Sequence, residues 1–113
     1  MTVFEIKRGD TAPAFEKSLK TGGGEPVNLD GFTEIDFHMR DDDYNTVIDD
    51  DTSGAVSVVI ATSGDVSYQW QSGDTETLGS YKAEFVVTFG DGTKQSFPRR
   101  GMYDVEVTED IDD

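Results

Sequence analysis

The sequence predicts an all-β fold, a sandwich of about eight or nine short antiparallel strands. Two observations lead to this class. Apolar and polar side chains alternate within short segments, as expected of strands with one buried face. Turn-forming residues recur at spacings of roughly 8–12 residues, and no window shows the period of a helix. We expect one sandwich domain over residues 1–108 and an acidic tail at 109–113 of the 113-residue chain.

The first half of the chain contributes five of the predicted strands. They span residues 3–8, 14–19, 33–40, 46–48 and 54–61. In the first segment, Phe4 and Ile6 share a face. In the second, Phe15, Lys17 and Leu19 share a face, so an apolar pattern is interrupted by a charge. The fifth segment is rich in valine and other β-branched residues, which favour strands.

The third of these segments alternates most regularly. Its apolar side chains are Ile35, Phe37 and Met39, and its polar side chains are Asp36, His38 and Arg40. Acidic triplets at 41–43 and 49–51 are predicted to form turns on either side of the short fourth strand. The glycine-rich residues 21–26 are predicted to form a loop.

The second half of the chain contributes four further strands. They span residues 65–70, 80–89, 93–97 and 102–108. Val66, Tyr68 and Trp70 share one face of the first. The inward side chains of the longest are Tyr81, Ala83, Phe85, Val87 and Phe89. A glycine-containing hairpin loop at 90–92 joins this strand to the next. The last strand directs Tyr103, Val105 and Val107 inward.

Tyr81 indicates which type of sandwich this is. In immunoglobulin-like sandwiches a tyrosine lies near the start of strand F, two residues before a core cysteine, and its hydroxyl bonds to upstream backbone. Here Tyr81 lies near the start of the longest strand, and Ala83 takes the cysteine position. An ordinary core-facing tyrosine would give the same pattern. The sequence therefore predicts an immunoglobulin-like sandwich whose structural residues are Tyr81, Trp70, Phe37 and Phe85.

The chain is strongly acidic. It has 24 Asp and Glu against 9 Lys and Arg, a formal net charge of −15. Such a charge repels itself and disfavours the compact state unless salt, bound cations or a basic partner relieve the repulsion. We interpret it as the surface of a protein from a high-salt environment. It argues against a nucleic-acid partner, which needs a basic patch. No apolar run approaches the length of a membrane span, and no secretion signal precedes the first strand, so no membrane partner is expected.

Few residues point to catalysis. His38 is the only histidine, and with Asp36 it is the one pair that would support an enzyme; the sequence identifies no nucleophile beside this pair. The chain has no cysteine, no transition-metal cluster and no nucleotide-binding motif. We therefore expect no enzyme activity, no catalytic residue and no cofactor.

Calcium or bulk salt cations are the remaining candidates for a bound group. Calcium takes six to eight oxygen ligands, several of them from carboxylates. The candidate ligands are Asp41, Asp42, Asp43, Asp49, Asp50 and Asp51, in two triplets that a hairpin would bring close together. Their spacing is not that of an EF-hand, and solvated acidic turns give the same sequence.

Several stretches in order resemble a known family. They are residues 6–11 (IKRGDT), 37–40 (FHMR), 68–75 (YQWQSGDT), 79–85 (GSYKAEF), 91–93 (DGT) and 97–98 (FP). Together they resemble the N-terminal domain of the baseplate upper protein family of tailed phages, relatives of which occur as small stand-alone proteins. The resemblance covers nearly the whole chain. It implies an immunoglobulin-like sandwich that docks to other virion proteins, and it carries over no catalytic residue. The receptor-binding extension of baseplate proteins does not follow the last strand here, which favours decoration or a small adaptor.

The function expected from these observations is structural. We expect a non-enzymatic protein of a tailed-virus virion, a tail or baseplate adaptor or a capsid-surface decoration, from a virus of a halophilic archaeon. Its partners would be other virion proteins, and a homo-oligomer is compatible with virion symmetry. The alternative is an extracellular or cell-surface immunoglobulin-like module that binds glycans or calcium. Its aromatic platform would consist of Tyr44, Tyr68, Trp70 and Tyr103, three of which the alternation assigns to the core.

Two segments are candidates for the contact with a partner. One is the glycine-rich loop at 21–26. The other contains Phe97, Arg99 and Arg100, a basic pair in an acidic protein that would suit an acidic neighbour. A solvated turn between two strands is the simpler reading of this second segment.

Overall fold

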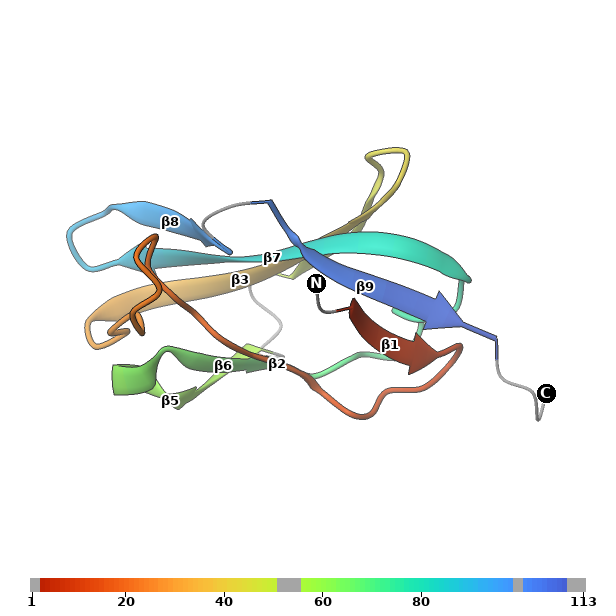
Figure 1. Ribbon diagram of the computed structural model, residues 1–113, viewed down its shortest axis with the longest axis horizontal. Helices are drawn as coiled ribbons and strands as arrows, with labels where there is room; N and C mark the ends of the chain where they lie inside the picture. Colours follow the sequence, from red (N-terminus) through yellow and green to blue (C-terminus); the bar gives the residue numbers. More distant parts are fainter. Residues whose placement is uncertain (1–2, 51–55, 99–100, 110–113) are drawn as a thin grey trace.

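The computed structural model describes residues 3–50, 56–98 and 101–109, and places them in two packed β-sheets (Figure 1). The described strands, in chain order, are β1 (Val3–Lys7), β2 (Phe15–Ser18), β3 (Phe32–Asp41), β4 (Thr46–Asp50), β5 (Val56–Ile60), β6 (Asp65–Tyr68), β7 (Gly79–Phe89), β8 (Lys94–Phe97) and β9 (Tyr103–Thr108). A single turn of 3₁₀-helix, η1 (Ala61–Ser63), joins β5 to β6. The predicted β-sandwich is confirmed.

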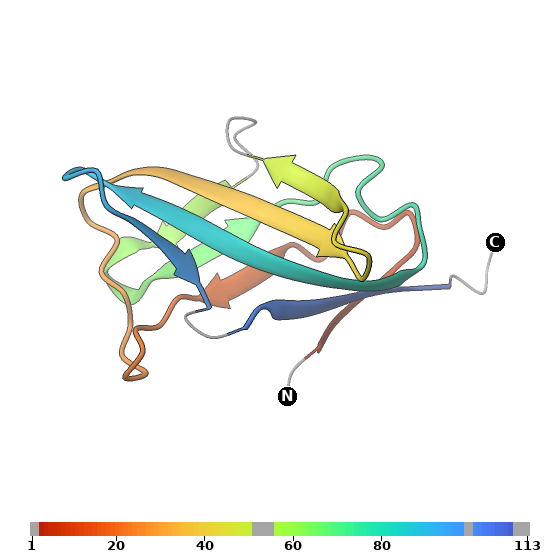
Figure 2. The same cartoon turned by 90° about the horizontal axis from the view of Figure 1, so that it is seen from above.

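The larger sheet is built around β7, its longest strand. The order is β1-β9-β7-β3-β4, and β8 also pairs with β7. One edge of β7 pairs with β3 along nearly its whole length. The other edge is shared, since the start of β7 pairs with β9 and its end pairs with β8 (Figure 2). The smaller sheet has the order β2-β6-β5 and covers one face of the larger sheet (Figure 1).

The expectation of a wholly antiparallel fold is wrong at one pair of strands. β1 runs parallel to β9, with Val3 opposite Asp104 and Lys7 opposite Thr108. Parallel neighbours cannot be joined by a short hairpin. β1 and β9 come from the two ends of the chain and need no short connection. The sequence of β1 does not indicate the direction of such a distant partner strand.

The predicted strands agree with the observed ones to within a few residues at each end, except near β4. Asp49 and Asp50 continue β4 instead of forming a turn. Asp49 is paired with His38 of β3 and Asp50 with Phe37. The turn prediction for these two residues is therefore wrong, because cross-strand pairing with β3 outweighs the low strand propensity of aspartate. Asp51, the third member of the triplet, lies outside the described residues.

An aromatic cluster fills the space between the sheets. Phe15 from the smaller sheet contacts Phe37 and Phe85 of the larger sheet, with ring centroids 5.6 and 6.0 Å apart. Tyr68 stacks on Phe37 at 4.1 Å, and Trp70 meets both rings edge-on at 5.4 and 6.0 Å. All five side chains are at most 2% exposed. Trp70, Phe37 and Phe85 are therefore core residues, as predicted.

The position of Lys17 explains why a charged residue interrupts the apolar pattern of residues 14–19. Its side chain shares a face with Phe15 and extends toward Tyr103 of β9. There its Nζ atom lies 5.3 Å from the centroid of the Phe15 ring and 5.2 Å from that of Tyr103. The aliphatic stem of a lysine can cover such aromatic surface while its ammonium group stays near water. Burial raises the pKa of Tyr103 to about 12.

Gly64 allows the crossing from β5 to β6 to pack against a neighbouring loop. It has a φ of +71°, and a Cβ atom at this position would lie 2.7 Å from the carbonyl oxygen of Leu19 and 2.8 Å from that of Val27. Its own carbonyl accepts a hydrogen bond from the Leu19 amide at 2.8 Å. Any side chain here would both strain the backbone and collide with main-chain atoms.

Tyr81 makes the hydrogen bond expected of the motif that drew attention to it. Its hydroxyl donates to the carbonyl oxygen of Thr77, four residues upstream, at 2.6 Å. The ring is 5% exposed, and Ala83 on the same face is fully buried. Burial, with a smaller contribution from the Asp41 carboxylate, raises the pKa of Tyr81. The hydrogen bond fixes the corner that leads into β7.

Candidate interaction surfaces

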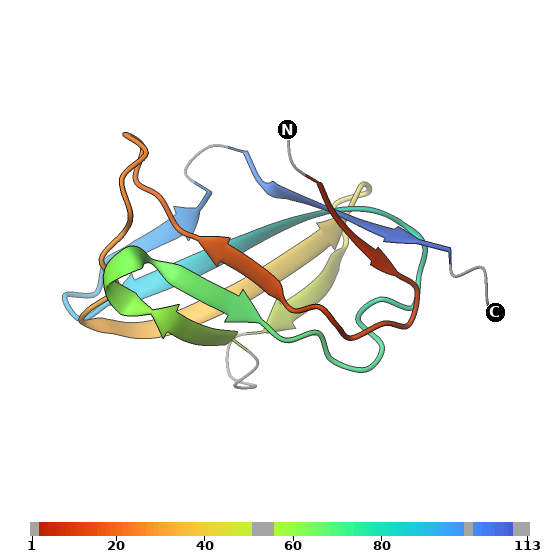
Figure 3. The ribbon, with the colours of Figure 1, turned by 60° about the horizontal axis from the view of Figure 1, so that its bottom comes forward.

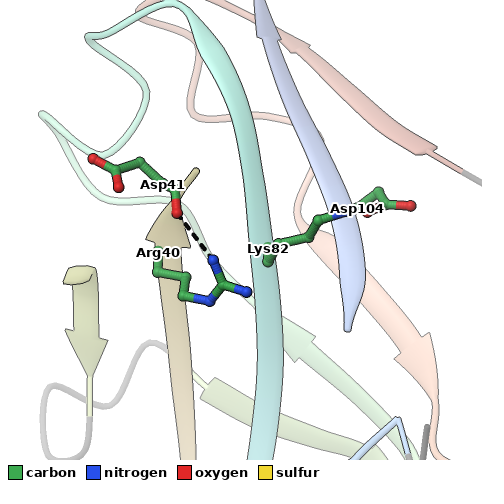
Figure 4. Close-up of polar contacts among 4 residues, drawn as sticks. All are labelled: Arg40, Asp41, Lys82 and Asp104. Carbon is green, nitrogen blue, oxygen red and sulfur yellow. Dashed lines mark hydrogen bonds and ion pairs between the residues drawn. The ribbon is translucent and has the colours of Figure 1, made fainter. Parts of the chain in front are cut away.

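The outward face of the larger sheet carries a basic pair. Arg40 of β3 and Lys82 of β7 are direct cross-strand partners, and Lys82 in turn is opposite Asp104 of β9. Residues that share a row across a sheet point to the same face. Their neighbours Met39 and Ala83 are buried in the core, so Arg40 and Lys82 face outward. Figure 4 shows Arg40 on β3 and Lys82 on the neighbouring strand β7.

Arg40 is held without a carboxylate partner in the described part of the chain. Its Nη1 atom donates to the backbone carbonyl oxygen of Asp41 at 3.1 Å (Figure 4). Its guanidinium carbon lies 4.1 Å from the centroid of the Tyr44 ring, and Tyr44 is itself 77% exposed. Guanidinium groups bind carboxylates through two parallel hydrogen bonds, and this stacked arrangement leaves donors unused. Arg40 is thus available to an external carboxylate.

Lys82 is partly neutralised. Its ammonium group forms an ion pair with the carboxylate of Asp104 on the neighbouring strand. Arg40 and Lys82 would otherwise repel each other as like charges directly opposite in a sheet. Asp104 therefore reduces the cost of placing the two cations side by side.

A second row of polar side chains, two of them acidic, lies next to the basic pair. His38 of β3 is opposite Asp49 of β4 on one side and Glu84 of β7 on the other. The His38 Nε2 atom lies 3.3 Å from a carboxylate oxygen of Asp49. The carboxylate that His38 meets is therefore on the neighbouring strand, whereas the sequence had suggested Asp36.

The two rows border a shallow cavity of about 190 Å³ on the outward face. Its wall includes Met102 of the segment before β9, and its remaining lining residues are His38, Met39, Arg40, Thr46, Asp49, Lys82 and Glu84. It is an open hollow in a sheet surface. Basic and acidic side chains both line it, so it suits a polar contact with another protein better than the enclosure of an apolar ligand.

The described members of the two acidic triplets lie apart along the β3–β4 hairpin. Asp41 ends β3 and begins the turn to β4, whereas Asp49 lies near the far end of β4, opposite His38. Across the described residues, no group of three or more histidine, cysteine or acidic side chains is placed to hold a metal ion. For Asp49 the predicted proximity to the first triplet is wrong, because β4 continues through Asp49 and Asp50 and leads away from the turn. Asp51 lies outside the described residues.

Asp41 organises the turn. Its carboxylate accepts hydrogen bonds from the backbone amides of Asp43 and Asn45, each at 2.9 Å, and from the Asn45 side chain. These hydrogen bonds, chiefly the one from the Asn45 amide, lower the pKa of Asp41. Asp42 and Asp43 are exposed on the turn. A carboxylate at the first position of a turn commonly bonds to the backbone in this way, which gives Asp41 a structural role.

Of the second predicted contact segment, the structure describes Phe97. Phe97 ends β8 and is fully buried, so the expectation that it contacts a partner is wrong; it belongs to the core. Its inward position follows from its pairing opposite Phe85 of β7. Arg99 and Arg100 lie outside the described residues.

The predicted loop at 21–26 is exposed and is more regular than its three glycines imply. The Thr21 amide donates to the Glu25 carbonyl oxygen at 2.7 Å, and the Gly24 amide donates to the Thr21 carbonyl oxygen at 2.9 Å. A single bridge between Lys20 and Pro26 closes it. It projects from the body of the molecule in Figure 3.

The aromatic platform of the alternative function is not formed. Tyr68 and Trp70 are buried within the core, and the Tyr68 hydroxyl donates to Asp74 at 2.6 Å. Tyr103 packs against Phe15 and Phe85. Tyr44 is the one member of the proposed set that is largely exposed.

Sequence reasoning missed a junction at one end of the sandwich. The turn after β1 binds the segment that precedes β7. The Gly9 amide donates to the Thr75 carbonyl oxygen at 3.0 Å, and the Thr75 hydroxyl donates to the Asp10 carbonyl oxygen at 2.8 Å. The Gln69 side chain donates to the Thr11 carbonyl oxygen at 2.6 Å. Both segments belong to the stretches that carry the family resemblance, but nothing in their sequences shows that they touch.

In comparisons with protein-family models, curated proteins and solved structures, none matches this chain. The described residues contain no helix long and apolar enough to cross a membrane.

Proposed function

We propose that this chain is a non-enzymatic structural module of a tailed-virus particle, an immunoglobulin-like β-sandwich that docks to other virion proteins as an adaptor or a surface decoration. The observation that carries the proposal is the outward Arg40–Lys82 pair, a basic spot on a molecule of net charge −15. The Tyr81 hydrogen bond to Thr77 supports the immunoglobulin-like type. The resemblance to the baseplate upper protein family supports the virion setting.

Recognition on this module takes place on its outside. Aromatic side chains fill the interior between the sheets. The hollow beside Arg40 and Lys82 is a shallow feature of the sheet surface. Arginine and tyrosine are enriched at protein–protein interfaces and among the residues that contribute most to binding. Arg40 and Tyr44 supply such a pair.

The acidic surface determines the conditions under which docking occurs. In a high-salt environment of about 1 M ionic strength, the Debye length is about 3 Å. Repulsion between two acidic partners is then screened at distances beyond direct contact. A bidentate arginine–carboxylate contact at a partly buried site is screened less than exposed charges are. Arg40 therefore provides a specific contact to an acidic neighbour in a medium that weakens general charge effects.

The first test counts this chain in particles. Virus particles are purified in high salt from cultures that produce the protein, and its copies are measured by quantitative mass spectrometry against the major capsid protein. A copy number comparable with that of the capsid protein indicates decoration, and a few copies per particle indicate a baseplate or neck adaptor. Absence from the particles contradicts the proposed function.

A second test addresses the basic pair itself. We expect Arg40→Gln to reduce the copies retained per particle, because the variant loses the guanidinium group that would bind a carboxylate. Lys94→Gln removes the same charge from an exposed position on β8 and serves as the matched control. Equal retention of both variants and the unaltered protein would place the contact elsewhere on the module.

A further inference from the structure

The free edges of the two sheets differ in charge. β1, β2, β4, β5 and β8 each pair with a single described strand and so leave one edge open. Four of these strands carry charged residues, which are Glu5 and Lys7 in β1, Glu16 and Lys17 in β2, Asp49 and Asp50 in β4, and Lys94 in β8. β5 has the sequence VSVVI and carries none. Charges on an edge strand usually prevent it from pairing with another chain, and β5 lacks them. Its one irregularity is a shift of register against β6 between Val58 and Ile60.

The side chains of β5 are also unusually apolar for an exposed strand. Val59 is 59% exposed and Ile60 is 50% exposed, whereas Val56 and Val58 pack against the core. In the described part of the chain, β6 is the one strand that pairs with β5. In an antiparallel ladder about half of the backbone amide and carbonyl groups point away from the partner. β5 therefore offers unused backbone groups beside an apolar surface.

We propose that the free edge of β5 pairs with β5 of a second copy of this chain, in an antiparallel arrangement about a two-fold axis. Such pairing would join the two three-stranded sheets into one continuous sheet. A two-fold axis places the same strand opposite itself, so an uncharged strand meets an uncharged strand. This inference does not depend on the virion role, because it concerns the chain in solution.

The self-complementarity of the uncharged β5 edge favours a second copy as the occupant. A basic partner strand would be matched better by the acidic edge of β4. An acidic partner strand would be matched better by the edge of β8, which carries Lys94. Two copies of net charge −15 repel each other over most of their surface, and β5 is the edge at which no charged side chain has to be desolvated. β-branched residues, which make up four of its five positions, also favour cross-strand pairing.

The pairing should be weak and should depend on salt. One pair of five-residue strands buries much less than the roughly 1,200 Å² of a standard protein interface. β5 also lies over β3, the neighbour of β4, and Figure 3 shows β4 and β5 along the same side of the molecule. Association through β5 therefore brings Asp49 of the two copies nearer to each other, and salt must screen that repulsion.

The test is sedimentation velocity of the purified chain over a range of protein concentration, from about 0.1 M to about 3 M NaCl. We expect monomer at low salt and a growing fraction of dimer at high salt and high concentration. A monomer under every condition would overturn the proposal, as would a dimer that weakens as salt is added.

Matched variants locate the contact. Val59→Asp places a charge on the β5 edge, and Val47→Asp places the same charge on the β4 edge, where Val47 is 43% exposed. Both variants have the same net charge, so general repulsion is equal. We expect Val59→Asp to abolish the dimer and Val47→Asp to retain it. Ser57→Lys, which makes the chain less negative, should also abolish the dimer because it places a charge on the β5 edge.

Circular dichroism of each variant verifies that it is folded. If Val47→Asp abolishes the dimer and Val59→Asp does not, the copies pair through β4 and the proposal is wrong. If both variants still form a dimer, neither edge is the interface, and the proposal is equally wrong.

Discussion

The two faces of the larger sheet carry side chains of opposite kinds on the same strands. On β3 and β7 the inward side chains of Phe37 and Phe85 are fully buried in the aromatic cluster. The residues next to them in sequence, His38 after Phe37 and Glu84 before Phe85, point outward beside the shallow hollow. The inward face is close-packed and tolerates little change in volume, whereas the outward face is in contact with water. Stability should therefore depend on the inward face, and recognition should depend on the outward one.

The largest expected effect tests the inward face. Phe85→Ala should lower the free energy of unfolding by about 3–5 kcal/mol, because it leaves a cavity among Phe15, Phe37 and Tyr103. Urea denaturation in constant high salt would measure the change. Glu84→Ala, at the adjacent outward position, is the control and should change the value by less than about 0.5 kcal/mol. Comparable losses in the two variants would contradict the division between the faces.

The next effect concerns the corner that aligns β7. Tyr81→Phe keeps the ring and removes the hydroxyl that donates to the Thr77 carbonyl oxygen, and it should destabilise the protein by about 1 kcal/mol. Tyr103→Phe is the matched control, since the Tyr103 hydroxyl makes no hydrogen bond within the described residues. That control should change the free energy of unfolding by much less. Equal effects would show that the Tyr81 hydroxyl does not stabilise the corner.

A smaller effect is expected on the outward face. Lys82→Met breaks the ion pair with Asp104, and both side chains are partly exposed. Exposed ion pairs contribute about 1 kcal/mol or less to the free energy of unfolding. The variant recovers part of this loss because Arg40 no longer lies opposite a like charge. Thermal denaturation at low and high salt would measure it. A loss as large as that of Phe85→Ala would mean that this face also holds the fold together.

The smallest effect is a pH dependence at the turn between β3 and β4. The pKa of Asp41 is lowered in the folded state, so its contribution to stability is present above pH 3.8, the ordinary value, and is lost as the pH falls through the folded value. Asp41→Asn should thus be less stable than the unaltered protein at pH 7, and the difference should shrink as the pH approaches 3.

The matched control for this pH dependence is Asp42→Asn. Asp42 is on the same turn and accepts none of the hydrogen bonds that Asp41 accepts. Denaturation curves at several pH values would compare the three proteins. A difference between Asp41→Asn and the unaltered protein that does not vary with pH would show that the charge of Asp41 is not what stabilises the turn.

Local patterns in the sequence were enough to predict most strands and the core. The alternation in residues 33–40 and 80–89 identified the inward side chains of β3 and β7, because neighbouring side chains on a strand point to opposite faces. The corner tyrosine was recognised from its place at the start of the longest strand. The same alternation assigned Tyr68 and Trp70 to the interior, which argued against an aromatic platform.

The candidate contact surface was much harder to predict. Arg40 and Lys82 are 42 positions apart, and only the register of β3 against β7 makes them neighbours. The pairing of His38 with Asp49 depends in the same way on long-range register, because β4 continues through Asp49 although aspartate has a low propensity for strands. The prediction that Phe97 contacts a partner failed because the proline and two arginines that follow it make residues 97–101 look like a surface turn. Phe97 itself is the last residue of β8, which pairs with β7.

The sequence by itself determined that this chain forms a β-sandwich with an aromatic interior and an acidic exterior. Both properties follow from local alternation and from composition, which act before any distant residues meet. The tertiary structure alone decided which strands are neighbours. It made β1 parallel to β9, placed Arg40 beside Lys82, and left the uncharged β5 at an open edge. These features arise from long-range pairing, whose partners are chosen by the packing of the whole sandwich and not by the residues of one strand.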